Sequence, residues 1–214
     1  MNTKAEPEPR QSRTAMVRRG LRLRVTLFLM AMALPHSLPA AEAIGEVTLA
    51  RGRAFLSRDS GNALAEKGIA VLLDDTALTG DDSRLGLQLG TSTSIRLGAN
   101  ASLKIDRFIA GRDTTVTLET GPVVVERWKG ATPKMEVKTP YALLAARGTE
   151  FFAGPSKGVF GVFVKTGIVD VKTVRGSVRL KAGEGTDISE PGAPPSPPKV
   201  WAHPRVDAAL WSVR

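Results

Sequence analysis

Cysteine is absent from the 214-residue chain, and histidine occurs only as His36 and His203. Without cysteine the chain cannot form disulfides, thiolate nucleophiles, zinc knuckles or iron–sulfur clusters. One histidine in the body of the chain cannot build a His-based catalytic triad or a multi-histidine metal site. We therefore expect no catalytic residues, no metal and no cofactor, and a protein that is not an enzyme.

Aromatic residues are also scarce, at 5% of the chain. The net charge of +9 is uneven, because residues 1–40 carry seven basic and two acidic side chains, while the remaining 174 residues carry 23 basic and 19 acidic ones. The high pI is therefore mainly a property of the N-terminus. Proteins that bind RNA or single strands need stacking aromatics as well as charge. We expect no nucleic-acid partner.

The N-terminus has the three parts of a secretory signal. A basic segment, residues 1–24, precedes an apolar run at 25–34 and small residues at 38–43. The run is shorter than the roughly 20 residues needed to span a bilayer. We predict that residues 1–40 are a signal peptide and that the mature chain is periplasmic or secreted, with cleavage after residue 40, 41 or 43. An uncleaved inner-membrane anchor, a start at Met16 and a twin-arginine signal at Arg18-Arg19 remain alternatives.

After residue 43, apolar and polar residues alternate in short runs punctuated by Gly, Asn, Asp or Pro, as at 85–89, 94–97, 102–106 and 115–119. Side chains two apart lie on one face of a strand, so each run has a core face and a solvent face. Frequent turns favour an all-β fold with little helix. A weak G-x-V-x-(V/L) repeat occurs at 45–49, 121–125 and 167–171. It favours a twisted β-solenoid-like stack of short strands, with a β-sandwich as the alternative.

Proline density marks the end of the predicted β domain, which we place at residues 44–189. Five of the nine residues at 190–198 are proline, a composition typical of an extended linker. The tail, residues 199–214, is too short to fold alone. Its Trp201, Leu210 and Trp211 could dock on the domain or on a partner, and we favour docking on the domain.

The block from Thr139 to Phe151, TPYALLAARGTEF, resembles the T-P-x-A…R-G-T-x-F signature of the FecR domain. Matching segments flank it in the family's order, and the resemblance covers about residues 76–186. The signature residues in this chain are Thr139, Pro140, Arg147, Gly148, Thr149, Glu150 and Phe151.

The resemblance implies a twisted β structure in the periplasm. In the namesake regulators of iron-siderophore uptake, a cytoplasmic helical domain holds a sigma factor and a transmembrane helix leads to this domain. Here the segment before the apolar run has only about 24 residues, too few for such a helical domain. We therefore expect a free-standing exported form of the family.

We expect structural roles for the signature residues. Gly148 fits a position of positive φ, and Arg147 with Glu150 could form an ion pair or present Arg147 to an acidic partner. Trp128, beside Arg127, is the candidate interaction residue, because Trp and Arg are common binding anchors. Asp74-Asp75 and Asp81-Asp82 could bind calcium but are expected to be solvated loop acids.

The sequence therefore favours a non-enzymatic interaction or sensing module in envelope signalling, with an envelope protein as its partner. A cell-wall or polysaccharide binder and a membrane-anchored sigma-factor regulator of iron uptake are the alternatives.

Overall fold

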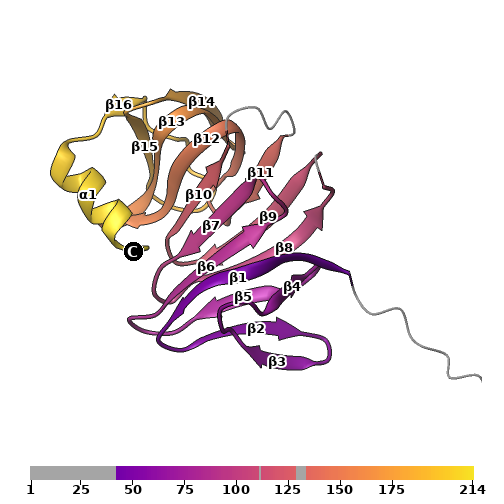
Figure 1. Cartoon of the computed structure of the whole chain (residues 1–214). Coiled ribbons are helices and arrows are strands. Elements are labelled where there is room, and N and C mark those ends of the chain that lie inside the picture. The colour runs from indigo at the N-terminus through magenta and orange to yellow at the C-terminus, as the bar shows by residue number, and fades with distance from the viewer. Residues whose placement is uncertain (1–41, 111, 129–133) are drawn as a thin grey trace, which may run out of the picture. The chain divides into compact units, whose positions relative to one another are not determined.

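The computed structural model describes residues 42–110, 112–128 and 134–214 (Figure 1). The predicted signal peptide, residues 1–40, lies outside the described residues, so its role stays a prediction. Within the described part, no helix is long and apolar enough to cross a membrane.

Short strands dominate the described part of the chain, and a single helix follows them, so the all-β prediction is confirmed. The elements are β1 (Ala43–Arg51), β2 (Ala54–Arg58), β3 (Gly61–Leu64), β4 (Ala70–Leu72), β5 (Thr76–Thr79), β6 (Arg84–Leu89), β7 (Thr93–Leu97), β8 (Ser102–Phe108), β9 (Thr114–Thr120), β10 (Val123–Arg127), β11 (Met135–Lys138), β12 (Leu143–Ser156), β13 (Val159–Thr173), β14 (Gly176–Lys181), β15 (Glu184–Ile188), β16 (Lys199–Val200) and α1 (His203–Trp211).

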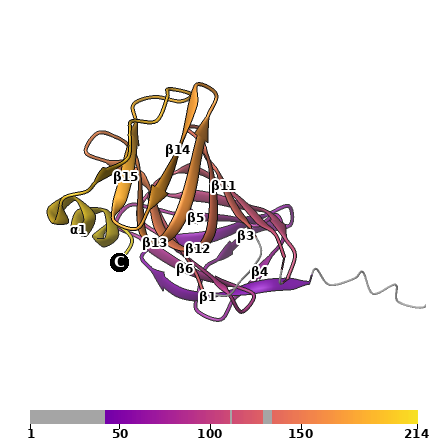
Figure 2. The same ribbon diagram turned by 90° about the horizontal axis from the view of Figure 1, so that it is seen from above.

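All of the strands belong to one curled sheet (Figure 2). Twelve follow one hydrogen-bonded path in the order β3-β2-β5-β8-β9-β11-β12-β10-β7-β6-β1-β4, and β13 extends the sheet from β12 to β14 and β15. Among the described strand pairs, only β9 with β11 is parallel. A regular solenoid, in which coils stack in parallel, is therefore not a clear match.

Strand β12 joins the two arms of this sheet. Its first half pairs with β11, its second half pairs with β10, and its other edge pairs with β13. Apolar side chains from both arms meet in one buried cluster between them. On β7, for example, Ile95 and Leu97 are buried in the cluster while Ser94 and Arg96 point outward. The period-two pattern of the sequence thus separates a core face from an outer face, as expected.

The outer face is divided into two halves. Trp201 and α1 cover Val124, Phe152 and Phe163, and these residues form a second buried cluster. We call this the covered half. Figure 2 shows α1 beside β15. No described residue covers in this way the outer face of β11, the first half of β12, the second half of β13 and β14, and we call this the bare half. Because β10 is buried on both faces, its run of three valines is continuous rather than alternating.

Residues 190–198 run along the sheet. The Ser196 N–H donates to the Asp187 carbonyl at 2.9 Å, and the Thr186 hydroxyl donates to the Ser196 carbonyl at 2.6 Å. Ala193 is buried in the main core cluster. The chain then forms β16 against β15. This proline-rich segment therefore lies on the outer edge of β15, where a residue without an N–H loses no ladder hydrogen bond.

Candidate functional site

The FecR-like signature begins with the tight turn that joins β11 to β12. The Thr139 hydroxyl accepts hydrogen bonds from the backbone N–H groups of Tyr141 at 3.1 Å and Ala142 at 2.9 Å. Pro140 occupies the second position of this turn, where its fixed φ is favourable. Thr139 and Pro140 thus fix where β12 starts.

Arg147, Gly148 and Thr149 form a bulge in the middle of β12. The register with β13 shifts between Arg147 and Glu150, and Gly148 has a φ of +59°. The prediction of positive φ at Gly148 is confirmed. On β13, Gly167 has a φ of +84°, and a Cβ there would lie 2.6 Å from the Gly148 carbonyl oxygen. The two glycines therefore allow two strands to bulge side by side.

Glu150 does form ion pairs, but not with Arg147, so the first of the two possibilities for Arg147 is wrong. Its carboxylate lies 3.2 Å from the Arg96 guanidinium and 2.8 Å from the Lys165 ammonium. Arg147 is exposed on the other side of the bulge. Phe151, the last signature residue, is fully buried in the main core. The signature thus combines a turn, a bulge, an ion pair and a core residue with one exposed cation.

The two candidate interaction residues differ sharply in exposure. Trp128 is 68% exposed at the end of β10, as an interaction residue requires. Arg127 is only 4% exposed, so it does not present its guanidinium to a partner. It follows Val123 and Val125 at a period of two and lies on the core-facing side. Burial lowers the pKa of Arg127, while the charge of Asp113 acts in the opposite direction.

The C-terminal tail docks on the domain through Trp201, which is 5% exposed. Its ring stacks on Phe163 with centroids 5.4 Å apart, and the Arg205 guanidinium lies 3.6 Å from its centre. Gly161 and Gly185 form the slot, because a Cβ at either position would come within 2.7 Å of the indole. The absence of a side chain at Gly161 and Gly185 therefore makes room for the indole of Trp201.

Asp187 on β15 fixes this docked arrangement. Its carboxylate accepts hydrogen bonds from Arg205 at 3.2 Å and from Lys199 at 2.6 Å. Burial raises the pKa of Asp187, but the hydrogen bonds from Arg205 and Lys199 outweigh it and hold the pKa below its usual value. Asp187 therefore remains ionised and paired at neutral pH.

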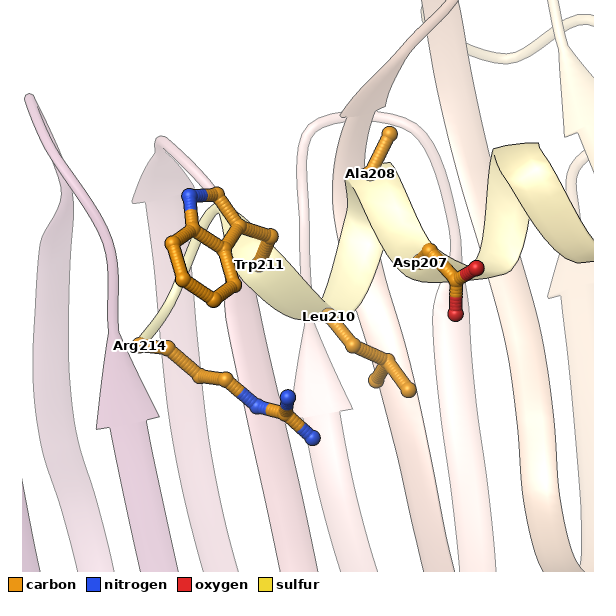
Figure 3. Close-up of a pocket in the computed structure, with 5 residues that line it drawn as sticks. All are labelled: Asp207, Ala208, Leu210, Trp211 and Arg214. Carbon is orange, nitrogen blue, oxygen red and sulfur yellow. The ribbon is translucent and has the colours of Figure 1, made fainter.

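The opposite side of α1 is exposed and includes an aromatic ring. A shallow hollow of about 370 Å³ is lined by Asp207, Ala208, Leu210, Trp211 and Arg214 (Figure 3). Trp211 is 70% exposed there. Asp207, Leu210, Trp211 and Arg214 follow the i, i+3, i+4, i+7 spacing of one helix face, in keeping with the helical period of the sequence from residue 206 onward. The hollow offers an apolar ring beside one acid and one base, which suits a protein contact better than catalysis.

A second cleft, of about 340 Å³, lies beside the stacked rings of Tyr141 and Phe160, whose centroids are 4.5 Å apart.

Among the candidate calcium residues, Asp75 is not a solvated loop acid, since it is buried and bonded to Arg58 at 2.8 Å. Within the described ranges, no group of three or more acidic, histidine or cysteine side chains could hold a metal ion.

Comparison with known proteins agrees with this architecture. Residues 75–179 match the model of the family described as FecR protein. No curated protein matches the sequence. Two crystal structures of a protein described as a "putative anti-sigma factor" from Parabacteroides distasonis ATCC 8503 resemble the fold, each with a TM-score of 0.54 and 18% sequence identity over 63% of this chain.

The chain covers 64% and 63% of those two structures, less than two thirds of their length, and at this identity the likeness concerns the fold alone. The family match contains the whole block from Thr139 to Phe151, together with the bulges at Gly148 and Gly167. The chain therefore carries a FecR domain at residues 75–179, within a curled sheet that extends beyond it at both ends.

Proposed function

We propose that this protein is an exported, non-enzymatic FecR-domain protein that binds another protein in envelope signalling. The FecR match and the fold it shares with the described anti-sigma factor support a regulatory role. The predicted signal peptide at residues 1–40 is the reason for proposing a periplasmic or secreted location. We further propose residues 44–189 as the β domain, with residues 199–214 as its docked tail.

The exposure of two tryptophans is the observation that carries the proposal. Trp128 and Trp211 are 68% and 70% exposed, whereas Trp201 is buried. Large aromatic rings are costly to leave in water, and they are the side chains that most often anchor protein interfaces. Leu210 and Arg214 beside Trp211 add an aliphatic and a cationic contact of the kind found in such interfaces. We propose Trp128 and Trp211 as partner-binding residues.

Site-specific photo-crosslinking in the source cells tests this proposal. A photoreactive amino acid replaces Trp128, Trp211 or, as a control, Ser60, an exposed residue in the turn between β2 and β3. Adducts are identified by mass spectrometry, and the same run reads the mature N-terminus. We expect one envelope protein to be crosslinked at position 128 or 211 but not at 60, with a chain that starts at Ala41, Glu42 or Ile44.

Other outcomes would replace this function with a different one. A sigma factor crosslinked to a chain with an intact N-terminus would make the protein a membrane-anchored regulator. Sedimentation with purified sacculi, lost in Trp128→Ala but kept in Ser60→Ala, would favour a cell-wall binder. Equal labelling at all three positions would contradict a specific interface at either tryptophan.

A further inference from the structure

The bare half of the outer face holds the positive charge that distinguishes the body of the chain. Two carboxylates lie on this face, Glu136 on β11 and Asp170 on β13. The six cations here are Lys134, Lys138, Arg147, Lys172, Arg179 and Lys181. The chain after residue 40 contains 23 basic and 19 acidic residues in total. Without the six cations and two carboxylates of this face, 17 basic and 17 acidic residues remain, and their charges balance. The net charge of this surface, +4, therefore equals that of the chain after residue 40, and the adjoining Arg175 and Glu184, which accepts a hydrogen bond from the Lys181 N–H, cancel each other.

Two of the six cations are neutralised locally. The Lys134 ammonium lies 2.7 Å from the Glu136 carboxylate, and Arg179 bonds Asp170 at 2.6 Å. The other four are exposed and have no hydrogen bond or ion pair from their side chains to any described residue: Lys138, Arg147, Lys172 and Lys181. They are free to bind an external anion.

The register of the strands places these four charges in two rows. Lys138, Leu143 and Lys172 lie opposite one another on β11, β12 and β13. Arg147, Ile168 and Lys181 form the second row, on β12, β13 and β14. With about 4.8 Å between strands and about 3.3 Å per residue, the four cations mark the corners of a patch roughly 10 by 13 Å. The clefts described above are lined by other residues, so this patch is an array of charges on the outer side of the curled sheet.

Exposed aliphatic side chains accompany the charges. Ile168 is 45% exposed between Arg147 and Lys181. Val174 is 88% exposed in the turn between β13 and β14, next to Arg175. Protein interfaces are enriched in aromatic residues and depleted in lysine, whereas four of the six cations here are lysines. A lysine-rich surface with an apolar tip is better suited to a layer of anionic headgroups than to a protein.

We propose that the bare half of the outer face docks on the surface of an anionic phospholipid bilayer. Lys138, Arg147, Lys172 and Lys181 bind lipid phosphates, and the turn at Val174 enters the headgroup layer. Each basic residue near an anionic membrane strengthens partitioning about fivefold, so four together give a factor on the order of 10³. The four cations belong to β11–β14 and not to the tryptophans assigned to protein binding, but Trp128 adjoins this surface, because Glu126, two residues before it, pairs with Glu150 on β12.

Vesicle binding by the full chain tests the proposal. Flotation is measured with vesicles of phosphatidylcholine alone or mixed with phosphatidylglycerol, at low and high salt. The test variant combines Lys138→Gln, Arg147→Gln, Lys172→Gln and Lys181→Gln. The control removes the same charge from four exposed cations elsewhere, as Arg53→Gln, Lys67→Gln, Arg107→Gln and Lys157→Gln. Residues 1–24 are present in every variant, so their basic charge does not enter the comparison.

A second readout locates the contact. Since the chain has no cysteine, Ser177→Cys on β14 and Ser60→Cys in the β2–β3 turn each give a single site for an environment-sensitive dye. We expect a blue shift at position 177 and none at position 60 with anionic vesicles. The shift should vanish in the test variant and at high salt.

The proposal predicts a loss of anionic-vesicle binding on the order of 10³-fold in the test variant and little change in the control. Equal losses in both variants, or dye shifts of the same size at positions 60 and 177, would overturn it. Tighter binding to polyglutamate than to anionic vesicles, lost in the test variant, would also overturn it and indicate an acidic protein instead.

Discussion

The covered and bare halves of the outer face belong to the same two long strands, yet they differ completely in chemistry. Where α1 lies over β12 and β13, the outward side chains include Phe152 and Phe163, and both are buried. Beyond the bulges, the same strands point Arg147 and Lys172 outward into solvent. The tail of the chain covers one half, whereas no described residue covers the other.

The bulges at Gly148 and Gly167 explain how one strand can serve two surfaces. An extra residue resets the alternation of side chains, so each half keeps its own apolar residues toward the core. Phe151 and Ala146, on opposite sides of the bulge in β12, both lie in the main core cluster. The Arg147-Gly148-Thr149 block of the family signature therefore marks the boundary between the covered and the bare half.

Removing the indole that seals the covered half should have the largest effect. Trp201→Ala empties the slot over Gly161 and Gly185 and is expected to lower the free energy of unfolding by about 3 kcal/mol or more. The tail should then become sensitive to protease. Urea unfolding followed by circular dichroism, with limited proteolysis, measures both effects.

Trp211→Ala is the matched control, since it removes the same side chain from the exposed side of α1. We expect a change within about 0.5 kcal/mol. A comparable loss of unfolding free energy in both variants would mean that the outer surface of α1 is also packed in solution. That result would contradict the distinction between a buried and an exposed side of the helix.

Substitutions at the boundary between the halves come next in size. Gly167→Ala combines positive φ with a Cβ placed against the Gly148 carbonyl, and should cost about 3 kcal/mol. Gly148→Ala has positive φ but open space around the new methyl group, so it should cost only about 1 kcal/mol. Thermal unfolding of both variants checks the order. The reverse order would show that the contact between the two bulges is loose.

Much of this architecture was accessible from the sequence. Alternation at 94–97 and 102–106 predicted half-buried strands, and the FecR-like block predicted the positive φ at Gly148. The same alternation places Arg127 on the core side with Val123 and Val125, so its burial follows from a rule that sequence reasoning did not apply at that strand.

The cationic surface could not be found in this way. Lys138, Arg147, Lys172 and Lys181 are far apart in sequence and come from four strands, and only the strand register brings them together. The bulges also shift that register by amounts that the sequence does not encode in any simple period. The ion pairs of Glu150 likewise join β7, β12 and β13, which no local pattern connects.

The ion pairs of the two halves should respond differently to acid. The pKa of Asp187 lies below its ordinary value, so its ionised form stabilises the fold. That stabilisation is complete above the ordinary aspartate pKa of about 3.9 and is lost as the pH falls through the lowered pKa. We expect the stability measured in urea to decline below about pH 4, and to decline less in Asp187→Asn.

Asp170→Asn is the matched change in the bare half. The hydrogen bond from Arg179 also holds the pKa of Asp170 below its usual value, but both side chains are half exposed or more. Solvent screening reduces the worth of such a pair. The pH dependence of stability in Asp170→Asn should therefore stay close to that of the unaltered chain. A larger change in this pH dependence than in Asp187→Asn would mean that the exposed Asp170–Arg179 pair stabilises the fold more than the ion pairs of Asp187.

The smallest effect on stability is expected where the proposed effect on binding is greatest. Replacing Lys138, Arg147, Lys172 and Lys181 together by glutamine removes no hydrogen bond or ion pair found among the described residues. It relieves repulsion between like charges, so the free energy of unfolding should stay within about 0.5 kcal/mol or rise slightly at low salt. Urea unfolding at two salt concentrations measures this. A strong destabilisation would mean that these cations support the fold, whereas an unchanged fold leaves them available for an external anionic surface.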